Sequence, residues 1–177
     1  MPDKTVLALG AEMVGRFALL KDGKITQSNE FGAISDYDNL QSYKKELNKT
    51  LNDFNPDIIL HDLHPTYVTT TLAKELAGKF NTRCHAVQHH VAHAYSVAME
   101  HKLTDFVGVI CDGMGYGDDG TVWGGEVIGE DKRVGHLEVH PLIGGDMATL
   151  HPKRFLYAIL SRFLDTEELV KYTAITE

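Results

Sequence analysis

Hydrophobic residues in the first part of the chain form three short runs and then a helical stripe. The runs are Thr5–Leu9, Arg16–Leu20 and Ile25–Glu30, and glycine-bearing turns separate them. Short apolar runs joined by such turns predict three strands of an antiparallel meander. Asp36 then offers a helix N-cap, and apolar residues recur at helical spacing until the Asn-Pro pair at 55–56.

The next segments alternate between strand and helix. Asp57–Leu60 and Arg83–Val87 are short apolar runs that predict buried strands. Between them we expect a helix with Pro65 at its first position, and after them a helix over Val87–His101. An antiparallel meander followed by alternating helices and parallel strands indicates a ribonuclease H-like α/β layer.

A second set of elements follows His101. Phe106–Cys111 predicts a buried strand, and Thr121–Ile128 should pair with Arg133–Val139 as a hairpin. Residues 151–164 predict one last helix, whose apolar stripe is Phe155, Ile159 and Phe163. We therefore expect a first lobe over residues 1–104 and the beginning of a second lobe over residues 105–177.

The helix over Val87–His101 is rich in histidine. At about 100° per residue, its apolar stripe is predicted to be Val91, Ala94, Tyr95 and Ala98, and its opposite side carries His89, His93, Ser96 and Glu100. Two imidazoles four residues apart point the same way, so both can reach one cation. The same pattern also fits a solvated polar face.

A glycine-rich run follows the strand that ends at Cys111. We expect Asp112 to end that strand and to open a loop that contains Gly113, Gly115, Gly117 and Gly120. Glycines at alternate positions let backbone N–H groups converge on an anion. Asp118 and Asp119 would repel a phosphate, which leaves two interpretations: Asp119-Gly120 is a hairpin turn, or a divalent ion bridges carboxylate and phosphate.

Composition narrows the class of protein. The net charge of −8 argues against binding to nucleic acid or to an anionic membrane. We see no spanning segment and no signal pattern, and we expect Cys84 and Cys111 to be buried free thiols in a reducing cytoplasm. Ten histidines are present, and seven of them fall between His61 and His101. The chemistry of this chain is therefore expected around these histidines.

Four motifs together resemble one family. HDLHPTY (61–67), VQHHVAH (87–93), DGMGYGDDGTVWGGE (112–126) and PLIGGD (141–146) occur in the order and spacing of the C-terminal domain of the HypF-type hydrogenase maturation carbamoyltransferase. That family is similar to the tRNA threonylcarbamoyl-transfer enzymes and to the antibiotic O-carbamoyltransferases. The resemblance implies an actin- and Hsp70-like two-lobed fold with a metal and a nucleotide in its cleft.

The resemblance also implies roles for individual residues. His89, His93 and Asp112 match the family's metal ligands, a donor set that suits one iron or zinc ion. Gly113, Gly115 and Gly117 would approach the phosphates of ATP or carbamoyl adenylate, with Gly120 in the same run. His61, Asp62 and His64 would line the cleft, although His64 fits a helix-capping or packing role equally well. Trp123 is expected in the core.

The implied reaction transfers a carbamoyl group to a cysteine thiolate at the C-terminus of a partner protein. We expect none of the family's upstream modules in these residues, and we expect the resemblance to stop soon after PLIGGD. Val14 stands where the family usually has a lysine. We therefore do not expect transfer by this chain alone, and we expect a second-lobe polypeptide or self-association. The alternative is a non-catalytic module that binds metal, nucleotide or a partner. A metalloprotease is set aside, because His90 replaces the glutamate of HExxH.

Overall fold

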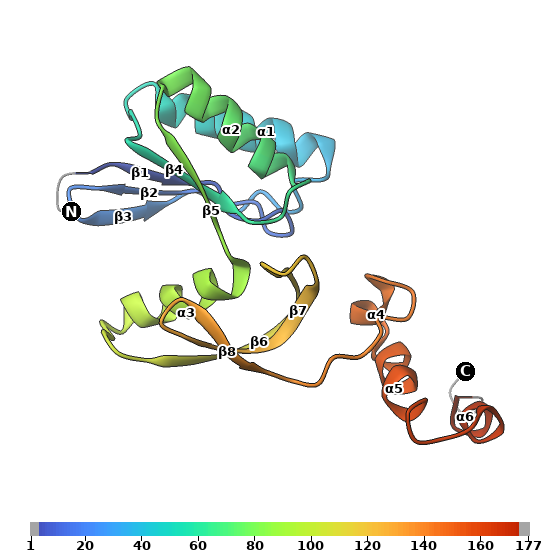
Figure 1. Ribbon diagram of the computed structural model, residues 1–177. Coiled ribbons are helices and arrows are strands. Elements are labelled where there is room, and N and C mark those ends of the chain that lie inside the picture. Colours follow the sequence, from blue (N-terminus) through green and yellow to red (C-terminus); the bar gives the residue numbers. More distant parts are fainter. Residues whose placement is uncertain (1–3, 174–177) are drawn as a thin grey trace. The chain divides into compact units, whose positions relative to one another are not determined.

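The computed structural model describes residues 4–173, which form two compact units (Figure 1). The first unit contains the described residues up to Asp105 together with Gly115–Val122. The second contains Phe106–Met114 and the described residues from Trp123 onward.

The first unit is built on a five-stranded mixed sheet. Its strands are β1 (Val6–Ala8), β2 (Ala18–Lys21), β3 (Lys24–Gln27), β4 (Ile58–Asp62) and β5 (Arg83–Val87), in the spatial order β3-β2-β1-β4-β5. β1 pairs antiparallel with β2, and β2 with β3, whereas β1, β4 and β5 run parallel. This arrangement confirms the predicted meander and the predicted α/β class.

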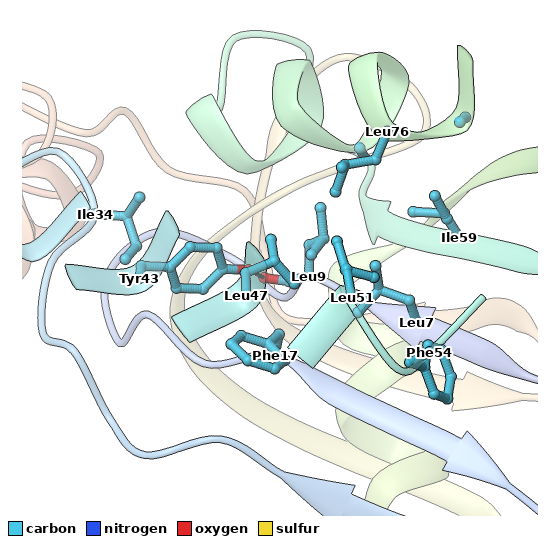
Figure 2. Close-up of a cluster of buried hydrophobic side chains, with 12 residues drawn as sticks. Leu7, Leu9, Phe17, Ile34, Tyr43, Leu47, Leu51, Phe54, Ile59 and Leu76 are labelled. Atoms are coloured by element: carbon cyan, nitrogen blue, oxygen red, sulfur yellow. Dashed lines mark hydrogen bonds between the residues drawn. The ribbon is translucent and has the colours of Figure 1, made fainter. Parts of the chain in front are cut away.

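Two helices cover one face of this sheet, α1 (Tyr37–Leu51) and α2 (Val68–Phe80) (Figure 1). The core between helices and sheet is continuous, and the Tyr43 hydroxyl inside it donates a 2.9 Å hydrogen bond to the Leu9 carbonyl. Figure 2 shows the core side chains: Leu7, Leu9, Phe17, Ile34, Tyr43, Leu47, Leu51, Phe54, Ile59 and Leu76. Burial of these side chains fixes the carboxyl ends of β1 and β4, from which the candidate site is built.

The helix starts were predicted with mixed success. Asp36 caps α1 as expected, because its side chain accepts hydrogen bonds from the Asp38 and Asn39 N–H groups. The prediction for α2 is wrong, because the helix begins at Val68 and not at Pro65. The start of α2 is capped by a residue from outside the helix. Glu12, in the loop after β1, accepts a hydrogen bond from the Val68 N–H through its carboxylate. A negative charge at this end of a helix is favourable.

The second unit contains a three-stranded sheet in the order β6-β7-β8. Its strands are β6 (Val107–Tyr116), β7 (Val122–Gly129) and β8 (Lys132–His136). β7 and β8 form the predicted hairpin, and Glu130 and Asp131 at its tip both have positive φ, as the favoured two-residue turn requires. Trp123 is 4% exposed beneath the Arg133 guanidinium, which confirms its predicted place in the core.

The end of the chain differs from the prediction of one helix over residues 151–164. The described residues up to 173 form three helices here, α4 (Met147–Leu150), α5 (Pro152–Leu160) and α6 (Thr166–Thr173). Phe163 lies outside α5 and is 75% exposed, so the expected apolar stripe is interrupted. No helix among residues 4–173 is long and apolar enough to cross a membrane.

The two cysteines occupy different environments. Cys84 is half-buried against the core, and burial raises the pKa of its thiol although Lys74 acts to lower it. Cys111 is exposed, so the prediction that both thiols are buried is wrong for this residue. The reason is strand alternation, since its neighbour Ile110 takes the buried face of β6.

A glycine in α2 offers a test of the local fold. A Cβ at Gly78 would meet nothing within 4 Å, so Gly78→Ala should raise the free energy of unfolding by about 0.5–1 kcal/mol in urea titrations. Gly10→Ala is the opposite control, because Gly10 has φ +67° and its Cβ would lie 2.8 Å from the Arg16 carbonyl oxygen. A destabilised Gly78→Ala variant would contradict the placement of this helix.

Candidate metal and substrate site

The site begins at the N-terminus of α3 (His89–Glu100), which follows β5. Gln88 caps this helix, since its Oε1 accepts the Val91 N–H at 2.9 Å. The same side chain donates from Nε2 to the Tyr116 carbonyl at 3.1 Å. Gln88 therefore fixes the start of the histidine helix and ties it to the segment Gly115–Val122 of the same unit.

The buried side of α3 is shifted from the predicted stripe. Ala94 and Ala98 are buried as expected, but Val91 and Tyr95 are only half-buried. His90, which was not part of the predicted apolar stripe, is 0% exposed and lies on the buried side of the helix with Ala94 and Ala98. Its Nδ1 lies 3.1 Å from the Gln88 amide nitrogen, which gives this buried imidazole a polar partner.

His89 and His93 converge on one point. Their Nε2 atoms are 3.2 Å apart. Two nitrogens that each bind one zinc ion at about 2.0–2.1 Å, at a tetrahedral angle, are separated by roughly 3.3 Å. The spacing of the pair therefore fits two ligands of a single ion.

Asp62 sets the orientation of His89. Its Oδ2 lies 2.7 Å from His89 Nδ1, and its Oδ1 accepts the His64 N–H at 2.8 Å. Burial acts to raise the pKa of Asp62, but the hydrogen bonds from His89 and from the His64 N–H outweigh it, and the pKa lies below its ordinary value. The ionised carboxylate can only accept, so His89 carries its proton on Nδ1 and presents the Nε2 lone pair.

A pocket of about 460 Å³ opens beside this pair, within the first unit. It lies at the carboxyl ends of β1, β4 and β5, where open α/β sheets usually bind ligands. Small and apolar residues form most of its wall, together with a few polar side chains. The lining residues are Ala8, Gly10, Ala11, Leu60, His61, Asp62, Val87, His89, Ala92, His93 and Ser96.

The three residues predicted to line the cleft differ in their position relative to the pocket. His61 and Asp62 line the pocket, but His64 does not. The His64 ring stacks on Tyr67, with centroids 4.0 Å apart, and meets the edge of Tyr116 at 5.1 Å. His64 thus packs beside the site and supports it through its backbone N–H.

The sequence predicted that a glycine-rich loop begins at Asp112, and this prediction is wrong. β6 continues to Tyr116, so Asp112, Gly113 and Gly115 are strand residues. The turn comes later, where Gly117 N–H donates to the Thr121 carbonyl at 2.8 Å and Asp119 Oδ1 accepts the Thr121 N–H at 2.9 Å. The hairpin-turn interpretation of Asp119-Gly120 is therefore the one that the structure supports. The Gly117 and Gly120 N–H groups are used inside this turn.

Gly115 is required by close packing against the histidine rings. A Cβ at this position would lie 2.5 Å from His90 Cε1 and 2.9 Å from His89 Cδ2. Asp112 lies on the part of β6 that belongs to the second unit, where its Oδ1 accepts the Gly113 N–H at 2.7 Å. Sequence reasoning assigned neither Gln88 nor His90 to the site. Gln88 lay inside the helix predicted over Val87–His101, and His90 was considered only as the residue in place of the glutamate of HExxH.

Comparisons with known families cover nearly the whole chain. Residues 1–100 match the family described as the HypF Kae1-like domain. Residues 108–176 match the second subdomain of the Kae1-like carbamoyltransferase domain. The prediction that the resemblance stops soon after PLIGGD is therefore wrong.

Individual relatives agree with these matches. A probable carbamoyltransferase HypF from Methanocaldococcus jannaschii is 38% identical over 93% of this chain, which covers 23% of that relative. A carbamoyltransferase HypF homolog from Cupriavidus necator is 36% identical over 88% of this chain, which covers 41% of it. The chain thus spans less than half the length of these curated relatives.

Solved structures give the same result. T. kodakarensis HypF aligns with a TM-score of 0.86 at 37% identity, over 94% of this chain and 23% of that one. A full-length HypF in the phosphate- and nucleotide-bound form aligns with a TM-score of 0.78 at 30% identity, over 94% of this chain and 28% of that one. These similarities confirm the predicted fold class.

Proposed function

The chain belongs to the HypF Kae1-like domain family, and from this premise we propose that it forms the metal-binding part of a carbamoyltransferase. His89 and His93 would hold one iron or zinc ion. The observation that carries this proposal is the pair of Nε2 atoms 3.2 Å apart, one of them oriented by the Asp62 carboxylate. Neutral imidazoles held by outer hydrogen bonds in this way are typical of metal ligands.

Asp112 is our candidate for the third ligand. It lies on β6, three residues before Gly115, whose backbone packs against the His89 and His90 rings. Three residues of strand span about 10 Å, so connectivity keeps the carboxylate near the histidine pair. Two imidazoles and one carboxylate leave coordination positions open for a substrate.

We propose carbamoyl adenylate or ATP as the ligand of this site. A similar HypF was solved in a phosphate- and nucleotide-bound form, which supports a ligand of this class. The ion would act as a Lewis acid that polarises the carbamoyl carbonyl. The residues of this chain would orient His89, hold the ligand in a small and mostly apolar pocket, and exclude water from it.

The acceptor would be the thiolate of a cysteine at the C-terminus of a partner protein, in keeping with hydrogenase maturation. Because that nucleophile belongs to the partner, Cys84 can remain packed against the core. The chain covers 23% and 41% of the two curated relatives. We therefore propose that complete transfer needs a second polypeptide or self-association.

Metal content after anaerobic purification tests this proposal. Elemental analysis should find about one iron or zinc ion per chain, and His93→Gln and Asp112→Asn should each lose most of it, because each removes one ligand. His85→Gln is the matched control, since His85 is an exposed histidine on β5 outside the pocket, and it should keep its metal. A wild-type chain that stays empty after zinc is added would overturn the proposal.

A further inference from the structure

The proposed metal site gives no role to His61, a polar side chain of the same pocket. His61 lies near the carboxyl end of β4, is 8% exposed, and lines the pocket. Its Nδ1 lies 2.6 Å from the Asp62 carbonyl oxygen. A carbonyl oxygen can only accept, so Nδ1 carries a proton, and in the corresponding neutral tautomer Nε2 presents a lone pair.

The other polar side chains of the pocket are already engaged. Both oxygens of Asp62 accept hydrogen bonds, one from His89 and one from the His64 N–H. Ser96 donates its hydroxyl to the His93 carbonyl at 2.8 Å. His89 and His93 direct their Nε2 atoms at each other. Among the side chains that line the pocket in the described part of the chain, His61 Nε2 is thus a ring acceptor that no hydrogen bond within the pocket uses, beside the lone pairs of the Ser96 hydroxyl oxygen.

Position and chemistry indicate what His61 would recognise. A carbamoyl group differs from an acetyl group by an NH2 in place of a CH3, so it brings two N–H donors into a pocket that is mostly apolar. A buried donor without an acceptor is costly, and a site built to bond an N–H rejects the analogue that lacks it. We propose that His61 Nε2 accepts a hydrogen bond from the carbamoyl N–H and so selects carbamoyl over other acyl groups. This inference rests on the proposed function, since it concerns the ligand of the same site.

Two acyl phosphates of nearly equal size test the selection directly. Carbamoyl phosphate and acetyl phosphate would be titrated by low-temperature calorimetry into the zinc-loaded full chain, so no transfer activity is needed. The wild-type chain should bind carbamoyl phosphate at least about tenfold more tightly than acetyl phosphate. His61→Phe keeps a ring of similar size without an acceptor and should remove most of this preference.

Two further variants separate recognition from folding. The amide of His61→Gln offers an oxygen near the position of Nε2, and this variant should keep part of the preference. His85→Gln changes a histidine outside the pocket and should keep all of it. Zinc content and melting temperature, measured on every variant, report whether the site is still assembled.

The outcomes distinguish the two proposals. A chain that holds no zinc would defeat the proposed function, and the inference would fall with it. A zinc-loaded wild-type chain that binds neither compound, or both equally, would overturn the role of His61 and leave the metal assignment intact. The role of His61 would be overturned in the same way if folded, zinc-loaded His61→Phe kept the full wild-type preference.

Discussion

Gly115→Ala is expected to abolish metal binding and to destabilise the first unit. The new Cβ would lie 2.5 Å from His90 Cε1 and 2.9 Å from His89 Cδ2, distances that carbon atoms do not tolerate. His90 is fully buried and its Nδ1 lies near the Gln88 amide, so it has little room to move. We expect a loss of about 1–3 kcal/mol in the free energy of unfolding, as for other overpacked sites. Zinc titration and urea unfolding would measure the two effects.

Gly113→Ala is the matched control for this prediction. Gly113 lies on the same strand two residues earlier, and its Cβ would meet only Thr149 Cγ2, at an ordinary 3.9 Å. This variant should unfold within about 0.5 kcal/mol of the wild type, because no close contact is created. Equal zinc affinity and equal stability in Gly115→Ala would mean that β6 does not approach the histidine rings as described.

The first unit was largely predictable because its sequence pattern and its packing agree. Apolar runs separated by glycine-bearing turns became β1, β2 and β3, and Asp36 became the cap of α1. The pattern failed where glycine and aspartate interrupt a strand. Both residues are depleted in strands, so the run after Asp112 was assigned to a loop. In the structure β6 continues through Gly113 to Tyr116, and at Gly115 the absence of a Cβ lets the strand lie against the histidine rings.

The polar contacts of the site could not be predicted from spacing. His89 and Asp62 are 27 residues apart and meet only because α3 starts beside the end of β4. His90 was placed neither on the predicted apolar stripe nor among the residues opposite it, yet it is fully buried, whereas Val91 and Tyr95 of the stripe are only half-buried. A residue scale cannot identify a buried histidine, since its burial depends on a hydrogen-bond partner from elsewhere in the fold. The pair of histidines at helical spacing was, in contrast, visible from the sequence alone.

The stability of the fold should depend on the charge of Asp62 at acid pH. Its pKa is lower in the folded state than the ordinary value of about 3.9, so its contribution is present above about pH 4 and is lost as the pH falls through the folded pKa. The difference in free energy of unfolding between wild type and Asp62→Asn should therefore be nearly constant above about pH 5 and shrink below about pH 4. Urea titrations at several pH values would measure it, and a difference that grows as the pH falls would contradict the hydrogen bonds assigned to this carboxylate.

Asp62→Asn should also weaken zinc binding by about 10–100-fold, because the carboxylate fixes both the tautomer and the orientation of His89 without touching the ion. An asparagine can turn either its oxygen or its NH2 group toward Nδ1, and the second choice would move the proton to Nε2, the atom that must bind the metal. Asp57→Asn is the control: the pKa of Asp57 is also lowered, by hydrogen bonds from Thr5, but the residue lies outside the pocket. That variant should lose some stability at neutral pH and bind zinc like the wild type. The contradicting result is an Asp62→Asn variant that keeps full zinc affinity while His93→Gln loses it. Packing within α3 would then orient the His89 ring, and the role of Asp62 would be limited to its hydrogen bond with the His64 N–H.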